Sequence, residues 1–231
     1  MLRGKRITLL CGHYGSGKTS IAINLALALR KTAEQVALAD LDIVNPYFRS
    51  KDRQRELEQA GIRFICSPYA NSNVDIPALP QEMYAITHDR TQTAILDIGG
   101  DDRGALALGR LAPAIREEND YEMLLVVNCF RPLTRDAAST IEIMREIEYA
   151  AGIPFTGIVN NSNLGSETTD EVILSSAAYA QEISSQTGLP ILLTTVADSW
   201  YDKVVEKLPN VFPIQLPSSL LTEGQVEKKE C

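Results

Sequence analysis

The 231-residue sequence has few of the residues that build metal or redox centres. Its four cysteines, at positions 11, 66, 129 and 231, form no C-x-x-C pair, and only two histidines are present. This scarcity argues against a metal site or a disulfide framework built from these residues. We therefore expect the cysteines to be reduced structural thiols.

Long apolar runs and an excess of positive charge are also missing. No stretch approaches the roughly 20 apolar residues of a membrane span. The first six residues run directly into an apolar segment, so we expect no signal peptide. Lys and Arg number 22 against 30 Asp and Glu, which gives a net charge of −8 and disfavours nucleic-acid binding. We expect a cytoplasmic protein with neither a membrane nor a nucleic acid as partner.

The remaining composition is that of an ordinary globular chain. It is 45% hydrophobic and 23% charged, which suits one large domain with a real core. Residues 217–231 are polar and show no periodicity. We predict one nucleotide-binding domain over residues 1–216 and a frayed C-terminal tail over 217–231.

Short apolar runs alternate with helix-like segments along the chain. The run Met123–Val127 is continuously apolar, as expected for a parallel strand covered on both faces. Residues 18–31 alternate like a strand, but their alanines and leucines favour a helix. The alternation predicts an α/β fold, a doubly wound, mostly parallel sheet of seven or eight strands with helices on both faces. The expected strands are 6–12, 36–42, 62–66, 93–98, 121–129, 155–160, 190–196 and 211–216, and the expected helices are 18–31, 52–60, 77–88, 103–117, 134–151, 168–187 and 199–208.

Between the first strand and the first helix, the sequence reads G-H-Y-G-S-G-K-T, the pattern of a phosphate-binding loop (P-loop). The glycines allow consecutive backbone N–H groups to turn inward around an anion, and the following helix adds its free N–H groups and dipole. Lys18 would reach the β- and γ-phosphates, and the Thr19 hydroxyl would ligate Mg²⁺. The predicted nucleotide-binding residues of this segment are Gly12, His13, Tyr14, Gly15, Ser16, Gly17, Lys18, Thr19 and Ser20.

Two further predicted strands end in aspartates, in the segments V-A-L-A-D-L-D (36–42) and T-A-I-L-D-I-G-G (93–100). The carboxyl ends of parallel strands meet at the edge where the P-loop lies. We expect Asp97 to hold Mg²⁺ directly or through water, and Gly100 to sense the γ-phosphate. Asp40 would lie near the metal. Asp42, further past the strand end, is the candidate for orienting or deprotonating the attacking water, with Lys18 as the second catalytic residue.

In this order, the motifs resemble the MinD/ParA and nitrogenase-iron-protein superfamily, which includes CobQ- and CobB-like proteins. The resemblance covers roughly residues 5–200 and rests on G-H-Y-G-S-G-K-T-S, A-D-L-D-I-V-N-P and L-D-I-G-G-D. It implies Mg-ATP binding and a nucleotide-driven switch. It also implies that Asp42 activates water, that Asp97 is the Walker B acid, and that Asn160 contacts adenine, with Asn161 and Asn163 as alternatives.

The first variable position of the loop departs from this resemblance. The MinD/ParA type has a signature lysine there, which reaches the phosphates of a partner subunit. This chain has His13 instead. The replacement counts against a nucleotide-dependent homodimer, although the sequence does not exclude one.

The sequence thus predicts a Mg²⁺-dependent ATP-binding protein and ATP hydrolase that acts as a switch on a protein client. One alternative is an ATP-dependent small-molecule ligase or synthetase, with an acceptor pocket near Asn71, Asn73 and Asp75. A second is a GTP-dependent metallochaperone, which the spelling of the loop favours and the lack of an N-K-x-D guanine motif disfavours. A third is a nucleotide sensor that scarcely hydrolyses ATP.

Overall fold

Eight strands form a single sheet in the computed structural model of the chain, which describes residues 4–42, 54–66, 79, 81–100 and 102–215. All neighbouring strands are parallel, in the order β3-β2-β4-β1-β5-β6-β7-β8. The strands are β1 (Ile7–Cys11), β2 (Val36–Leu41), β3 (Ile62–Cys66), β4 (Thr93–Ile98), β5 (Tyr121–Val127), β6 (Gly157–Asn160), β7 (Ile191–Ala197) and β8 (Val211–Ile214).

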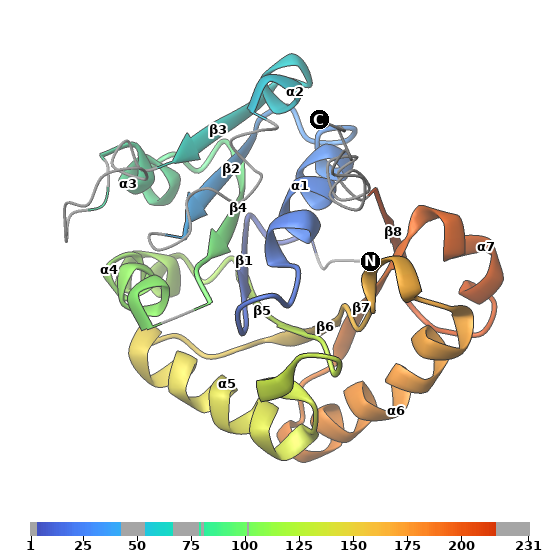
Figure 1. Ribbon diagram of the computed structural model, residues 1–231. Coiled ribbons are helices and arrows are strands. Elements are labelled where there is room, and N and C mark those ends of the chain that lie inside the picture. Colours follow the sequence, from blue (N-terminus) through green and yellow to red (C-terminus); the bar gives the residue numbers. More distant parts are fainter. Residues whose placement is uncertain (1–3, 43–53, 67–78, 80, 101, 216–231) are drawn as a thin grey trace, which may run out of the picture.

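Helices cover both faces of the sheet (Figure 1). One face packs on α1 (Lys18–Leu29) and α2 (Gln54–Gln59). The other face packs on α3 (Gln81–His88), α4 (Asp102–Glu118), α5 (Ala137–Ala151) and α6 (Asp170–Thr187), whereas α7 (Tyr201–Val204) lies beside β8. Three short 3₁₀ helices complete the described elements: η1 (Pro132–Thr134), η2 (Gly165–Glu167) and η3 (Asp198–Trp200).

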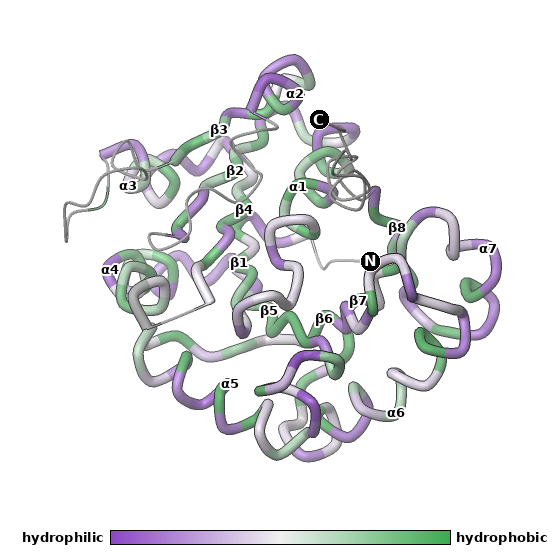
Figure 2. The backbone as a smooth tube through the Cα atoms, in the orientation of Figure 1, coloured by the Kyte–Doolittle hydropathy of each residue, from purple (hydrophilic) through white to green (hydrophobic). Residues whose placement is uncertain are grey.

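The side-chain alternation of the strands explains this two-layer covering. On β1, Ile7, Leu9 and Cys11 face the α4–α5 layer, and Leu10 faces α1, because successive strand residues point to opposite faces. All of these side chains are buried. Figure 2 shows the apolar residues gathered on the central strands and on α1, so the sheet is the centre of the core.

The predicted fold class is confirmed, and the strand count is eight. The helix predicted from residue 134 begins at Ala137, because the Asp136 side chain accepts a hydrogen bond from the Ser139 N–H and caps it. The helix predicted over 199–208 is wrong in extent, since only η3 and the four-residue α7 form there. The domain boundary at residue 216, the tail 217–231 and the cluster of Asn71, Asn73 and Asp75 lie outside the described residues. Every helix in the described ranges is too short or too polar to cross a bilayer.

Candidate nucleotide-binding site

The glycine loop leaves β1 between β4 and β5 and enters α1. Gly12, Gly15 and Gly17 all have positive φ angles, which side-chain-bearing residues rarely adopt. A Cβ atom on Gly12 would overlap the Val126 carbonyl of β5, so the loop lies against the neighbouring strand. The first N–H groups of α1, from Lys18 to Ser20, have no acceptor within the helix, and no side chain caps them.

The interior of the loop offers polar groups to an anion. The Lys18 side chain is buried, and its Nζ donates to the carbonyls of Gly12 (2.9 Å) and His13 (3.2 Å). The Ser16 Oγ is buried and has no hydrogen-bond partner among the described residues. An ammonium group and an unsatisfied hydroxyl inside a ring of amides fit a phosphate group.

His13 and Tyr14 form the outer rim of the loop. The His13 Nδ1 lies 3.0 Å from the carbonyl of Tyr14, and the Tyr14 side chain is 58% exposed. Their side chains therefore shape the tip of the loop, and their predicted nucleotide contacts stay predictions.

Thr19 and the two strand-end acids meet at the base of the loop. Asp40 on β2 and Asp97 on β4 are register neighbours, so their side chains leave the sheet on the same face, towards α1. The Thr19 Oγ1 on α1 donates to the Asp97 Oδ2 at 2.5 Å. Asp42 follows β2, is half-buried, and donates its N–H to the Asp40 Oδ1 at 2.9 Å. The structure thus brings together the three predicted metal ligands and places Asp42 beside them.

This cluster of acids favours a cation. The pKa of Asp97 is raised to about 7, chiefly by burial and then by the neighbouring Asp40 carboxylate, while Lys18 and the hydrogen bond from Thr19 act in the opposite direction. The ligands are all oxygens, which Mg²⁺ prefers. In the described part of the chain, no three His, Cys, Asp or Glu residues form a metal-binding group. The oxygen atoms of Thr19, Asp97 and Asp40 nevertheless suit Mg²⁺, whose remaining ligands would be phosphate and water oxygens.

Gly100 packs directly on the loop. A Cβ atom there would lie 2.6 Å from the Tyr14 backbone nitrogen, and one on Gly104 would lie 2.6 Å from the Gly99 carbonyl oxygen. The segment that leaves β4 is therefore wedged between the tip of the loop and the first turn of α4.

The asparagines after β6 have different partners. The Asn160 Nδ2 donates to the Ser176 Oγ on α6 (3.0 Å), and its Oδ1 accepts from the Ser162 N–H (3.2 Å). Asn161 is the residue that reaches the loop, because its Nδ2 donates to the Ser16 carbonyl at 2.7 Å. The Thr195 hydroxyl on β7 orients this amide through a 2.6 Å hydrogen bond to the Asn161 Oδ1. The role predicted for Asn160 stays a prediction, and its amide is bonded to α6.

A narrow crevice of about 20 Å³ lies next to Asn161, at the carboxyl ends of β6, β7 and β8. The crevice adjoins the glycine loop, because Asn161 lines it and also contacts Ser16. A purine would require the crevice to widen. None of its lining residues is acidic; they are Asn161, Ser162, Asn163, Gly165, Thr168, Ile173, Thr195, Val196, Ala197 and Ile214.

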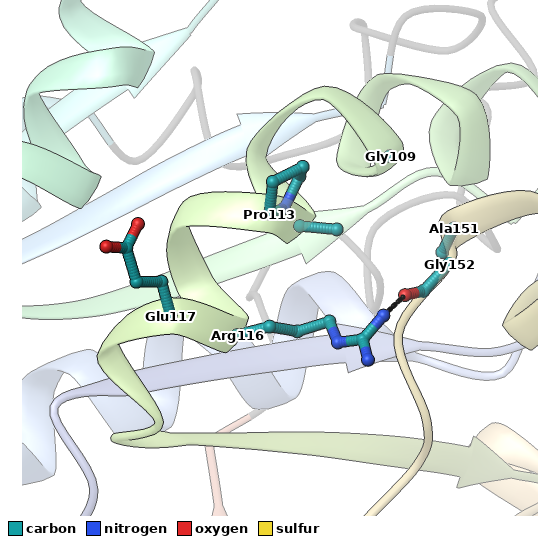
Figure 3. A pocket seen from close by; sticks show the side chains of 7 residues that line it. Gly109, Pro113, Arg116, Glu117, Ala151 and Gly152 are labelled. Carbon is teal, nitrogen blue, oxygen red and sulfur yellow. Dashed lines mark hydrogen bonds between the residues drawn. The ribbon is translucent and has the colours of Figure 1, made fainter.

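A larger and more open groove, of about 470 Å³, lies far from the loop between α4 and α5. Figure 3 shows the Arg116 guanidinium reaching across it to the Gly152 carbonyl, at 3.1 Å, while the Glu117 side chain lies apart. Most of the remaining lining residues are small and none is a nucleophile. The edge that holds the glycine loop therefore remains the candidate site.

Arg131 is a site residue that the sequence patterns did not indicate. Its Nε donates to the Gly15 carbonyl at 2.9 Å, although 116 positions separate the two residues. No motif signals such a contact, because it arises only when the turn after β5 is placed beside the loop.

Comparisons with known proteins agree with this geometry. A family model described as "CobQ/CobB/MinD/ParA nucleotide binding domain" (CbiA) matches residues 7–171. Among curated proteins, the cytosolic Fe-S cluster assembly factor cfd1 of Emericella nidulans is 30% identical over 123 residues, which are 49% of this chain and 35% of cfd1.

Solved structures of the cell-division protein FtsY have a similar fold. Chloroplast FtsY from Physcomitrella patens has a TM-score of 0.59 at 14% identity, with 95% of this chain and 64% of that chain covered. FtsY from Thermotoga maritima has a TM-score of 0.55 at 18% identity, with 85% and 63% covered. The chain thus spans about a third of the length of cfd1 and less than two thirds of these FtsY chains. The family model covers most of the chain, so the protein belongs to the CobQ/CobB/MinD/ParA family of P-loop nucleotide-binding proteins.

Proposed function

We propose that this protein binds Mg-ATP at the glycine loop, hydrolyses it, and uses the cycle as a conformational switch for a protein client. The observation that carries the proposal is the hydrogen bond between Thr19 and Asp97. It joins the start of α1 to the end of β4. Asp40 is the register neighbour of Asp97, and Lys18 is near enough for its charge to act on the Asp97 carboxyl group.

The binding step rests on the interior of the loop. The amides that begin α1 and the Ser16 hydroxyl would donate hydrogen bonds to the phosphate oxygens. Lys18 would exchange its carbonyl acceptors for phosphate oxygens. Thr19, Asp97 and Asp40 would hold Mg²⁺, which neutralises charge on the phosphates. A cation is favourable here because the two acids are buried next to each other. Its positive charge would offset the repulsion between their carboxylates.

Hydrolysis requires a group that orients water, and Asp42 is our candidate. It is half-buried at the end of β2, beside the Asp40–Asp97 pair, and therefore reaches both the site and the solvent. A carboxylate in this place can accept a proton from, or align, a water molecule that attacks the γ-phosphate.

ATP is the proposed nucleotide because of the chemistry of the crevice. The base would occupy the crevice beside Asn161. The N1–H and amino group of guanine are donors that a carboxylate recognises, and none of the described residues that line the crevice is acidic. Amide, hydroxyl and backbone groups next to apolar side chains suit adenine, which offers both a donor and an acceptor.

The switch is proposed from the packing of the segment that follows Asp97. Gly100 contacts the loop and Gly99 contacts α4, so a shift at the γ-phosphate would move α4. Small displacements at such interfaces are amplified because packed contacts have discrete arrangements.

Two measurements test the proposal. Calorimetry with Mg²⁺ should detect ATP binding that Lys18→Ala abolishes, and should show weaker binding of GTP. Single-turnover hydrolysis in Asp42→Ala should be about 10²-fold or more slower than in the wild type, with ATP affinity nearly unchanged. Equal rates in the two proteins would remove Asp42 from catalysis. If both rates are negligible although ATP binds, the protein is a sensor and not a hydrolase.

A further inference from the structure

Arg131 approaches the glycine loop from a rigid turn. It lies just after β5 and immediately before η1, and its own N–H donates to the Asn128 carbonyl at 3.2 Å. Asn128 is fully buried, and its Oδ1 and carbonyl also accept hydrogen bonds from Phe130 and Thr134. The backbone of Arg131 is thereby fixed, and its side chain extends over the exposed Gly15.

The contact that Arg131 makes controls one peptide group of the loop. Its Nε donates to the Gly15 carbonyl at 2.9 Å. In a planar trans peptide the C=O and the next N–H point in opposite directions. The Ser16 N–H therefore points away from Arg131, and it donates across the loop to the His13 carbonyl at 3.2 Å.

Asn161 acts in the same way on the next peptide, through the Ser16 carbonyl. Two donors from outside the loop thus hold consecutive carbonyls outward, so that the amides following them face inward. Gly15 has a φ of 76°, and a glycine gives little conformational restraint of its own. External hydrogen bonds replace that restraint and lower the cost of ordering the loop around a ligand.

We propose that Arg131 is a positioning residue for nucleotide binding, which acts through its Nε hydrogen bond to the Gly15 carbonyl rather than through its charge. The inference rests on the proposed function of the loop. It assigns a role in phosphate binding to the turn after β5.

Three substitutions separate the hydrogen bond from the charge. Arg131→Gln places an amide nitrogen at the same distance along the side chain as the arginine Nε, without the charge. Arg131→Lys keeps the charge and puts a methylene group at that position. Arg131→Met has a similar length and provides neither. Because the side chain is exposed, none of the three should disturb the core.

The test is calorimetric titration of each variant with Mg-ATP, with thermal unfolding of the nucleotide-free proteins as a measure of integrity. We expect Arg131→Gln to bind about as tightly as the wild type. Arg131→Met and Arg131→Lys should bind about tenfold more weakly, as expected for the loss of one hydrogen bond. All melting temperatures should be the same, and Mg-ATP should bind to Arg131→Gln with the wild-type stoichiometry.

Other results would overturn the inference. Tight binding by Arg131→Lys with weak binding by Arg131→Gln would show that charge matters and not the hydrogen bond. Wild-type affinity in all three variants would show that Arg131 has no role. An equal loss of affinity in all three would show that a neutral hydrogen-bond donor is not sufficient, contrary to the inference. Affinities that fall in step with melting temperature would indicate a merely structural role. Absence of ATP binding in the wild type would instead refute the proposed function itself.

Discussion

Two features of its surroundings raise the pKa of Asp97: its carboxyl group is buried, and a second acid, Asp40, lies beside it. Its pKa is raised to about 7, first by burial and then by Asp40. The native protein therefore holds this proton more tightly than the unfolded chain does. The stabilisation from this proton is complete below the ordinary pKa of about 4 and is lost as the pH rises through about 7.

We predict that Asp97→Asn stabilises the metal-free protein at pH 8, by on the order of 1–3 kcal/mol in the free energy of unfolding, because an amide pays no such penalty. The gain should shrink towards pH 5. Urea unfolding at both pH values measures it, with Asp202→Asn, an exposed site on α7, as control. If the variant showed the same pH slope as the wild type, the native carboxyl would have to titrate normally.

Single residues also show the limits of prediction from sequence. The loop residues and the strand-end acids are local patterns, and the structure places Thr19, Asp40 and Asp97 together as expected. The choice among the asparagines after β6 is different, because Asn161 is recognisable only by its contact with Ser16, 145 positions away. Adjacent residues of the same type carry no signal of which one turns towards the loop.

At the scale of elements, the connection from β4 to α4 determines how the site can communicate. Gly100 and Gly104 allow backbone to approach backbone, with Gly100 against the loop and Gly104 against Gly99. A side chain at position 100 or 104 would separate elements that now touch.

We predict that Gly100→Ala weakens Mg-ATP binding about tenfold or more, since the added methyl group would lie 2.6 Å from the Tyr14 nitrogen and would displace the loop. Calorimetry of the variant measures the effect. Gly109→Ala is the matched control, because it also adds one methyl group, on α4 facing the Ala150 carbonyl and away from the loop. Wild-type affinity in Gly100→Ala would mean that the loop does not need this close contact.

Elements with strong internal periodicity are predicted well, whereas short ones depend on their neighbours. The pattern of Ile141, Met144 and Ala151 identifies α5, and Gly152 ends it in the left-handed conformation expected of a C-terminal glycine. By contrast, α7 ends at Val204, and the chain continues in turns in which the N–H groups of Lys207 and Leu208 both donate to the Val204 carbonyl. Val204 and Leu208 pack with Val196 in a small satellite core. The ten-residue pattern of 199–208 does not show where the regular helix stops.

For the whole molecule, the strand order explains the position of the site. β1 lies between β4 and β5, so the chain continues to opposite sides of it. In open α/β sheets, ligands bind where the strand order reverses in this way. The alternation of strands and helices predicted the sheet, but the order of its strands follows from packing over the complete chain.

We predict that a non-hydrolysable ATP analogue with Mg²⁺ leaves the protein at the mass of one chain. His13 has a short side chain whose Nδ1 lies by the Tyr14 carbonyl of its own loop, so it is poorly placed to reach the phosphates of a second copy as a lysine would. Light scattering with and without the analogue checks this. A doubling of mass would show that a dimer forms by contacts other than the missing lysine.

The close packing of Gly12 against the Val126 carbonyl has a consequence for any shortened version of this protein. The three motifs that carry the family resemblance lie within residues 12–101. The groups that contact the glycine loop and hold it in place come from positions 126, 131, 161 and 195. A fragment ending at residue 101 would carry all three motifs, but without β5 it would expose one edge of β1. Possession of the motifs is therefore a poor guide to function in truncated chains, since the second half of the polypeptide makes the first half competent.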